Sequence, residues 1–228
     1  MSQTRDAGSP GAVFLSPHND DETLFGSFTL LRERPRVITV LRSQVQEQRG
    51  TGVTYREREA ENAAALEVLG ITDWEQWTYA DDDPPWREIR ERLASVQAEH
   101  VYAPAVERRG HAHHNAIGEL AGAVWPGKVT YYTTYTTWGR TKRGHEVPWE
   151  HEWVLLKLRA LSCYRSQILV PGTWTTHHFL DAQAEYYAAE SSPISSAVYW
   201  ASDTSHFLRS ALAGASARVG FGRSSAGR

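Results

Sequence analysis

Cysteine is almost absent from this chain, because Cys163 is the single cysteine among its 228 residues. One thiol excludes both an intrachain disulfide and a multi-cysteine zinc knuckle, so any metal must be held by histidine and carboxylate side chains. Long apolar runs are also lacking, since none approaches the roughly 18 residues of a membrane span, and residues 1–15 lack the apolar stretch of a secretory signal. We therefore expect a cytoplasmic protein with no membrane partner.

An excess of charge of one sign is lacking as well. The chain has 24 Lys and Arg against 27 Asp and Glu, a formal net charge of -3. Such a balance gives no general attraction to phosphate backbones, so we expect no nucleic-acid partner. The end of the chain, 209–228, is basic and rich in Ser, Gly and Ala, and we interpret it as a flexible tail. The remaining length suits a single domain over 1–208.

Short apolar runs rich in β-branched and aromatic residues alternate with longer helical patterns. This alternation is typical of βαβ units, so the sequence predicts an α/β fold built on a mostly parallel sheet. The predicted strands are 11–15, 36–41, 74–80, 101–105 and the alternating stretch 128–139. The predicted helices are 21–34, 55–70, 85–100, one from about Asn115, 149–167 and 176–190.

Two polar motifs follow the first and fourth predicted strands. "SPHNDDE" (16–22) carries His18, Asp20 and Asp21, and "HAHHNAIG" (111–118) carries three histidines. The carboxyl ends of parallel strands share one edge of the sheet, so the two motifs are expected to meet there. Imidazole and carboxylate without thiolate suit Zn²⁺ or a similar divalent metal, and three protein ligands would leave a position for water.

Each motif also has a simpler interpretation. Asp20 and Asp21 could only cap the following helix, and His111, His113 and His114 could be solvated loop residues. The two motifs together, at corresponding strand ends, favour the metal site. Four other histidines are weaker candidates for function: His145, His151, His177 and His178.

The two motifs resemble the A-H-P-D-D-E and H-P-D-H-x-A-x-G signatures of the PIG-L/LmbE-like zinc-dependent N-acetylglucosaminyl deacetylases. Lesser marks agree in order, including the pair Arg58 and Glu61 and the stretch "KLRALSCYRSQ" (157–167), and the resemblance covers about residues 12–168. It implies a Rossmann-like sheet with helices on both faces. It also implies hydrolysis of an N-acetyl group on a small N-acetylated sugar or glycoconjugate, with Zn²⁺ as the cofactor.

Carried onto this sequence, the resemblance implies metal ligation by His18, Asp21 and His114, general base catalysis by Asp20, and stabilisation of the oxyanion by His111. In this chemistry the metal lowers the pKa of water, the base accepts the proton, and the oxyanion donor lowers the barrier. Arg58 resembles an arginine that contacts sugar hydroxyls, although a helix-surface salt bridge with Glu61 explains it equally well.

Two residues depart from the signatures. Asn19 replaces a proline, which removes a fixed φ but no reacting group. His113 replaces an aspartate that the resemblance casts as the partner orienting His111. With His113 there, activity could be lower, shifted in pH optimum or absent, and His113 could itself compete for the metal.

Two functions therefore compete with the deacetylase. A metal hydrolase of another amide or of a phosphoester would use the same donor set. A catalytically impaired metal-containing protein could instead bind a glycan through the aromatic-rich segment 125–153. The sequence does not identify the natural substrate, whose loops we place at 42–55, 80–87 and 130–152, and Trp86, Trp138 and Trp149 are candidates to line its pocket.

Overall fold

The computed structural model describes residues 11–43, 52–136, 139–140, 143–169 and 184–188. Its centre is a seven-stranded sheet in the order β3-β2-β1-β4-β5-β9-β8, of which the first five strands are parallel. The parallel strands are β1 (Ala12–Ser16), β2 (Arg36–Arg42), β3 (Trp74–Ala80), β4 (His100–Pro104) and β5 (Val129–Tyr132). The strand order changes direction at β1, and β1 and β4 lie side by side.

The far edge of the sheet is antiparallel. Strand β9 (Tyr186–Tyr187) pairs with β5, and β8 (His145–Glu146) pairs with β9. A separate two-stranded sheet joins β6 (Tyr135–Thr136) to β7 (Gly139–Arg140).

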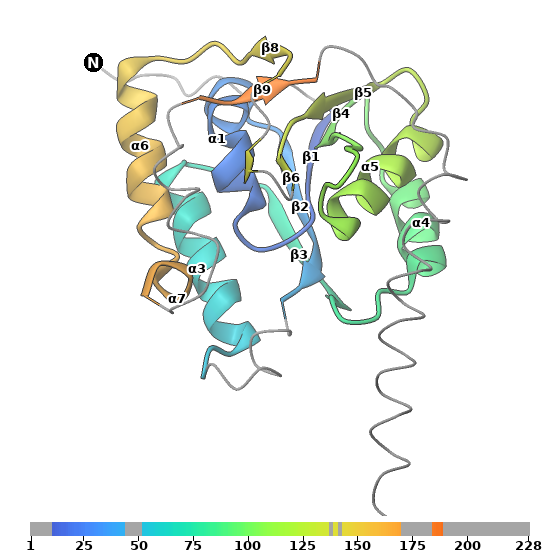
Figure 1. Ribbon diagram of the computed structural model, residues 1–228, viewed down its shortest axis with the longest axis horizontal. Helices are drawn as coiled ribbons and strands as arrows, with labels where there is room; N and C mark the ends of the chain where they lie inside the picture. The colour runs from blue at the N-terminus through green and yellow to red at the C-terminus, as the bar shows by residue number, and fades with distance from the viewer. Residues whose placement is uncertain (1–10, 44–51, 137–138, 141–142, 170–183, 189–228) are drawn as a thin grey trace, which may run out of the picture. The chain divides into compact units, whose positions relative to one another are not determined.

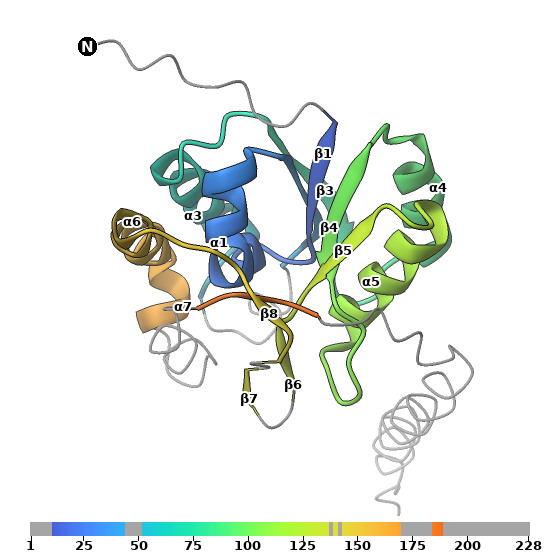
Figure 2. The ribbon, with the colours of Figure 1, turned by 90° about the horizontal axis from the view of Figure 1, so that it is seen from above.

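Helices cover both faces of the sheet (Figures 1 and 2). One face carries α1 (Asp21–Glu33), α3 (Tyr55–Val68), α6 (His151–Leu161) and α7 (Arg165–Leu169). The other carries α4 (Trp86–Ser95) and α5 (Ala112–Val124). A hydrophobic core lies on each face of the sheet, and successive side chains of β1 point into one or the other. Phe14 packs with α1 and α3, whereas Val13 and Leu15 pack with α4 and α5.

The sequence prediction of a mostly parallel α/β sheet is confirmed. Some predicted boundaries are wrong. Helix α5 begins at Ala112, three residues before Asn115, because His111 caps it. The stretch 128–139 is not one strand, since β5 ends at Tyr132 and β6 belongs to the other sheet. Residues 184–188 of the predicted helix 176–190 contain a strand, because Tyr186 and Tyr187 pair with β8.

Several predictions lie outside the described residues, namely those on 209–228, on His177 and His178 and on Trp138. Among the helices of the described ranges, none is both long and apolar enough to cross a membrane.

Candidate metal centre

The turn from β1 into α1 is tightly organised. Asp20 precedes the helix with φ 144°, a backbone conformation that costs a non-glycine residue of order 1–3 kcal/mol and is typical of functional sites. Glu22, buried in the first turn, accepts hydrogen bonds from the hydroxyls of Ser16 (2.9 Å) and Thr23 (2.8 Å), and another from Tyr164. Burial raises the pKa of Glu22 in spite of these donors. This network fixes the backbone that carries the motif's two aspartates.

Asp21 is the point on which the two motifs converge. Its Oδ2 atom lies 3.0 Å from Nδ1 of His18 and 3.1 Å from Nε2 of His114, and it accepts the backbone N–H of His18 at 2.9 Å. Burial alone would raise the pKa of Asp21, but the imidazoles of His114 and His18 hold it well below its ordinary value. Asp21 is therefore an ionised carboxylate between two ring nitrogens.

The second motif is fixed by the loop before α5. The side chain of Asn115 accepts the N–H of Glu107 and donates to its carbonyl oxygen, both at 2.9 Å. His111 then caps the helix, because its Nδ1 accepts the backbone N–H of His113 at 3.3 Å. The N-cap and the first helical turn thus project three imidazoles toward β1.

His114 is held from both sides. It is fully buried, its Nδ1 lies 3.1 Å from the hydroxyl of Thr134, and its ring packs against Phe25 and Tyr135. Its Nε2 points to Asp21 but makes no hydrogen bond within the described part of the chain. A fully buried ring nitrogen that faces a carboxylate oxygen at 3.1 Å is well placed to share a metal ion with it.

Asp20 faces a different partner. Arg58, only 3% exposed, donates to Asp20 Oδ2 at 2.8 Å, contacts the carbonyl oxygen of Asn19 and reaches Glu61 at 3.4 Å. Burial raises the pKa of Asp20 to about 7, the charges of Asp21 and Glu22 add to this, and Arg58 opposes it. The carboxylate of Asp20 can therefore exist with or without its proton near neutral pH.

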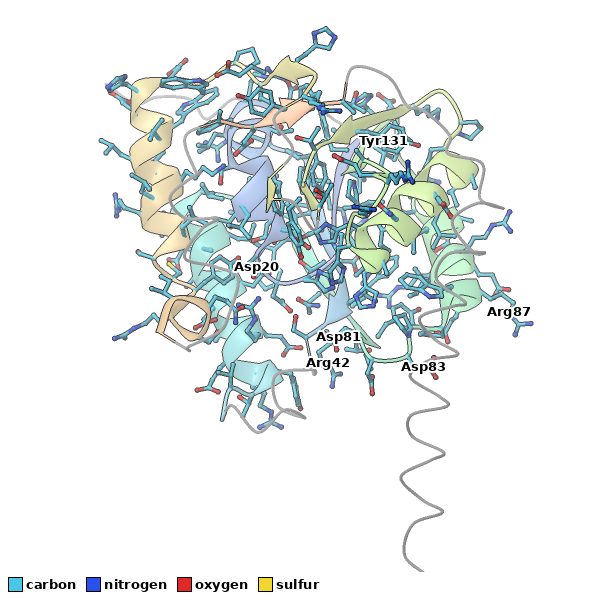
Figure 3. All side chains as sticks on the ribbon, in the orientation of Figure 1. Asp20, Arg42, Asp81, Asp83, Arg87 and Tyr131 are labelled. Atoms are coloured by element: carbon cyan, nitrogen blue, oxygen red, sulfur yellow. The ribbon has the colours of Figure 1, made fainter. Side chains whose placement is uncertain are left out.

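His111 and His113 are uncharged at neutral pH, whereas His18 is shifted the other way. Burial and the neighbouring histidines lower the pKa of His111 to about 2 and that of His113 to about 3. For His18, burial alone would lower the pKa, but Asp21, with Asp20 and Asp81, raises it above its ordinary value. Asp81, whose charge acts on His18, directly follows β3 and is labelled in Figure 3 with Asp20.

Among the residues that the structure describes, two overlapping triplets could hold a metal ion: His18 with Asp21 and His114, and His18 with His111 and His113. Within each, the potential ligand atoms lie within 4.8 Å of one another. The first triplet fits Zn²⁺ by its chemistry, since two imidazoles and one carboxylate make a common catalytic donor set. The orphaned Nε2 of His114 favours this triplet further.

The structure thus brings together His18, Asp20, Asp21, His111 and His114 from the two predicted motifs. The simple capping interpretation is wrong for Asp20, whose side chain makes no capping hydrogen bond, and the solvated-loop interpretation is wrong for the buried His114. His145 and His151 are exposed and lie outside both triplets. Arg58 is not on a helix surface, although its pairing with Glu61 exists.

Sequence reasoning missed Thr134 and Tyr135. The available signal was their position directly after β5, at the same sheet edge as the two motifs. Trp86, one of three pocket candidates, has its ring 6.0 Å from that of His113, whereas Trp149 stacks on Phe28.

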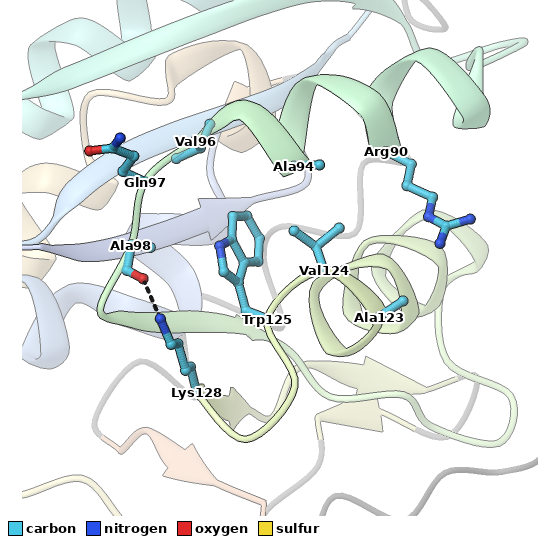
Figure 4. A pocket seen from close by; sticks show the side chains of 9 residues that line it. All are labelled: Arg90, Ala94, Val96, Gln97, Ala98, Ala123, Val124, Trp125 and Lys128. Carbon is cyan, nitrogen blue, oxygen red and sulfur yellow. Dashed lines mark hydrogen bonds between the residues drawn. The ribbon is translucent and has the colours of Figure 1, made fainter.

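A surface hollow of about 580 Å³ lies at the opposite edge, where α4 and α5 end (Figure 4). It includes Arg90, Trp125 and Lys128, and Lys128 donates to the carbonyl oxygen of Ala98 at 3.2 Å. None of its lining residues is a histidine, a cysteine or a carboxylate. It is therefore unrelated to the metal centre.

The comparisons with known proteins agree with this geometry. The family model PIG-L, described as GlcNAc-PI de-N-acetylase, matches residues 13–125, which include both motifs. The chain belongs to the PIG-L family. No curated protein matches the chain.

Solved structures show the same fold at low identity. N,N'-diacetylchitobiose deacetylase from Pyrococcus horikoshii is 21% identical, with a TM-score of 0.53, over 68% of this chain and 70% of its own. The A40926 pseudoaglycone deacetylase Dbv21 is 17% identical, with a TM-score of 0.56, over 72% and 86%. GalB, a 4-carboxy-2-hydroxymuconate hydratase from Pseudomonas putida KT2440, is 15% identical, with a TM-score of 0.54, over 78% and 94%. Because a hydratase shares the fold, the reaction must be argued from the site.

Proposed function

We propose that this chain is a metal-dependent N-deacetylase that releases acetate from an N-acetylglucosamine-type sugar or sugar conjugate. The observation that carries the proposal is the convergence of His18 and His114 on the Asp21 carboxylate, beside Asp20, in a chain of the PIG-L family. The names of two fold neighbours, a diacetylchitobiose deacetylase and the deacetylase of an antimicrobial pseudoaglycone, support this reaction and substrate class.

Zn²⁺ would be held by His18, Asp21 and His114, and when bound it would polarise the amide carbonyl and acidify water in the site. Asp20 accepts the proton of the attacking water as its oxygen bonds to the carbonyl carbon. The C–N bond then breaks, Asp20 returns that proton to the leaving amine, and the acetic acid formed loses its remaining proton to solvent, which leaves acetate and a free amino sugar.

His111 stabilises the oxygen on which negative charge develops. Its Nδ1 accepts a backbone N–H, so the one proton of the neutral ring lies on Nε2, which can donate. A carboxylate partner is needed only to stabilise a charged imidazolium, and the neutral ring of His111 donates without one. The loss of the family's aspartate at 113 is therefore compatible with turnover.

Arg58 holds Asp20 in place through the 2.8 Å ion pair. Its predicted contact with sugar hydroxyls stays a prediction, because its described contacts are with Asn19, Asp20 and Glu61. Trp86, beside His113, is suited to pack against a sugar face.

An acetate-release assay on N-acetylglucosamine and its simple conjugates tests the proposal. Asp20→Asn should lower the rate about 100-fold or more, the usual contribution of general base catalysis. The matched control is Asp73→Asn, which removes an exposed carboxylate just before β3, at the end of the strand away from the site, and should leave the rate unchanged. A chain that binds zinc and the sugar without releasing acetate would instead be a binding protein, and release from other amides or phosphoesters only would indicate a different hydrolase.

A further inference from the structure

His113 stands where the family signature has an aspartate, and its ring does not take over that residue's expected task. Its backbone N–H donates a hydrogen bond to Nδ1 of His111, but a residue of any type other than proline could supply this N–H. The imidazole instead reaches across to β1's loop, where its Nδ1 lies 2.8 Å from Nε2 of His18. The side chain at 113 therefore acts on a different histidine from the one that the motif suggested.

His18 is bonded at both ring nitrogens. Nδ1 lies 3.0 Å from Asp21 Oδ2, and Nε2 lies 2.8 Å from His113. A neutral imidazole has one proton, and a ring nitrogen that binds a metal must be free of it. For Nδ1 to join Asp21 and His114 as a ligand, the proton of His18 must lie on Nε2. The Nδ1 atom of His113 is placed to accept a hydrogen bond from this Nε2–H group.

We propose that His113 is a positioning residue that accepts a hydrogen bond from Nε2–H of His18 and so holds His18 in the tautomer whose Nδ1 binds the metal. Partners of this kind fix the ring orientation and tautomer of ligating histidines, and their loss commonly lowers metal affinity by about 10- to 100-fold. The inference rests on the metal centre of the proposed function. It differs from the rival arrangement in which His113 is a ligand, together with His18 and His111.

Substitutions at 113 separate these roles. In His113→Asn, Oδ1 occupies nearly the position of the histidine's Nδ1 and accepts the same hydrogen bond, but an amide oxygen is a poor zinc ligand. His113→Asp supplies a charged acceptor, and His113→Ala supplies none. His151→Asn is the matched control, since it replaces an exposed histidine in the first turn of another helix.

The experiment measures the Zn²⁺ affinity of the full chain and its variants by competition with a chromophoric chelator. We expect His113→Asn to remain within about threefold of the wild type, His113→Asp to bind as tightly or more tightly, and His113→Ala to bind about 10- to 100-fold more weakly. Co²⁺ bound to the wild type and to His113→Asn should show the same visible absorption bands, because the ligands are the same.

Two results would overturn the inference. If His113→Asn binds as weakly as His113→Ala and shifts the Co²⁺ bands while His113→Asp keeps its affinity, His113 is a ligand. If all variants bind equally, its side chain has no role. The expected affinity series in a protein that releases no acetate would leave the inference standing and refute the deacetylase proposal, whereas a wild type that binds no metal would refute both.

Discussion

Asp20 is the proposed general base, and its surroundings explain why this carboxylate can exchange a proton near neutral pH whereas that of Asp21 cannot. Asp21 lies between two imidazoles and stays ionised, whereas burial raises the pKa of Asp20 to about 7 in spite of the neighbouring Arg58. The positive φ of Asp20 turns successive side chains to different partners. Adjacent residues of the same type thus acquire different chemistry from their environment.

Arg58→Gln tests whether the guanidinium acts through Asp20. If Arg58 mainly positions the base, kcat should fall about tenfold or more while KM changes little, because the loss falls on the transition state. Steady-state kinetics of the wild type, Arg58→Gln and Arg58→Lys would measure this, with far-ultraviolet circular dichroism as the control for folding. A large rise in KM at nearly unchanged kcat would show that Arg58 binds the sugar instead.

The sequence indicated which side chains of the two motifs the structure brings together, but not how these side chains pair. His18, Asp21 and His114 could be predicted because their types and spacing match a known signature and because the order of the strands brings them together. The contact of His113 with His18 could not be predicted, because it depends on the directions of two side chains that are 95 residues apart in the sequence. The support of His114 by Thr134 was missed because a threonine after a strand carries no metal signature.

At the level of elements, the approach of α5 to β4 sets the position of His111 and His114. Gly118 makes this approach possible, because a Cβ atom there would lie 2.3 Å from the carbonyl oxygen of Pro104. The contact involves backbone, which cannot turn aside as a side chain can. The glycine of the second motif therefore has a packing role in placing His111 and His114.

Gly118→Ala should displace α5, destabilise the protein by about 1–3 kcal/mol and weaken zinc binding. Gly122→Ala is the control in the same helix, since its Cβ would meet only the end of a side chain, the Tyr131 hydroxyl at 2.5 Å. That substitution should be close to neutral. Chemical denaturation and zinc titration of both variants would check this, and equal stability of the two would contradict the account.

Element boundaries were the weaker part of the sequence prediction. The alternation of 128–139 suggested one strand, but Thr133 and Thr134 are buried at its bend, and the chain leaves the sheet there. The strand at 186–187 was mistaken for helix because two residues are too short for a periodic pattern, and their pairing partners are distant in sequence.

For the molecule as a whole, a buried ion pair joins the segment 184–188 to the helical face of the sheet. Lys157 of α6 donates to Glu185 at 2.6 Å and to the carbonyl oxygen of Leu24 at 2.9 Å, and both charged side chains are fully buried. Glu185 also accepts the backbone N–H of Phe28 at 3.0 Å. The pair thus ties α1, α6 and the antiparallel edge together.

Lys157→Met should lower the free energy of unfolding by about 3–5 kcal/mol, because it leaves the buried charge of Glu185 without a partner. The double variant Lys157→Met with Glu185→Gln should be more stable than the single variant, since the amide is uncharged and still offers an oxygen to Phe28. Denaturant unfolding of the two variants compares them. A double variant less stable than Lys157→Met would contradict this interpretation of the pair.

The central claim is that a metal held by the two motifs is required for release of acetate. The most direct measurement follows acetate release from N-acetylglucosamine conjugates by the untagged chain as purified, after removal of metal with a chelator, and after addition of Zn²⁺. The account predicts that release disappears with the metal and returns at about one equivalent of Zn²⁺ per chain, the content of a single three-ligand catalytic site. Release that continues unchanged in the metal-free protein would contradict it.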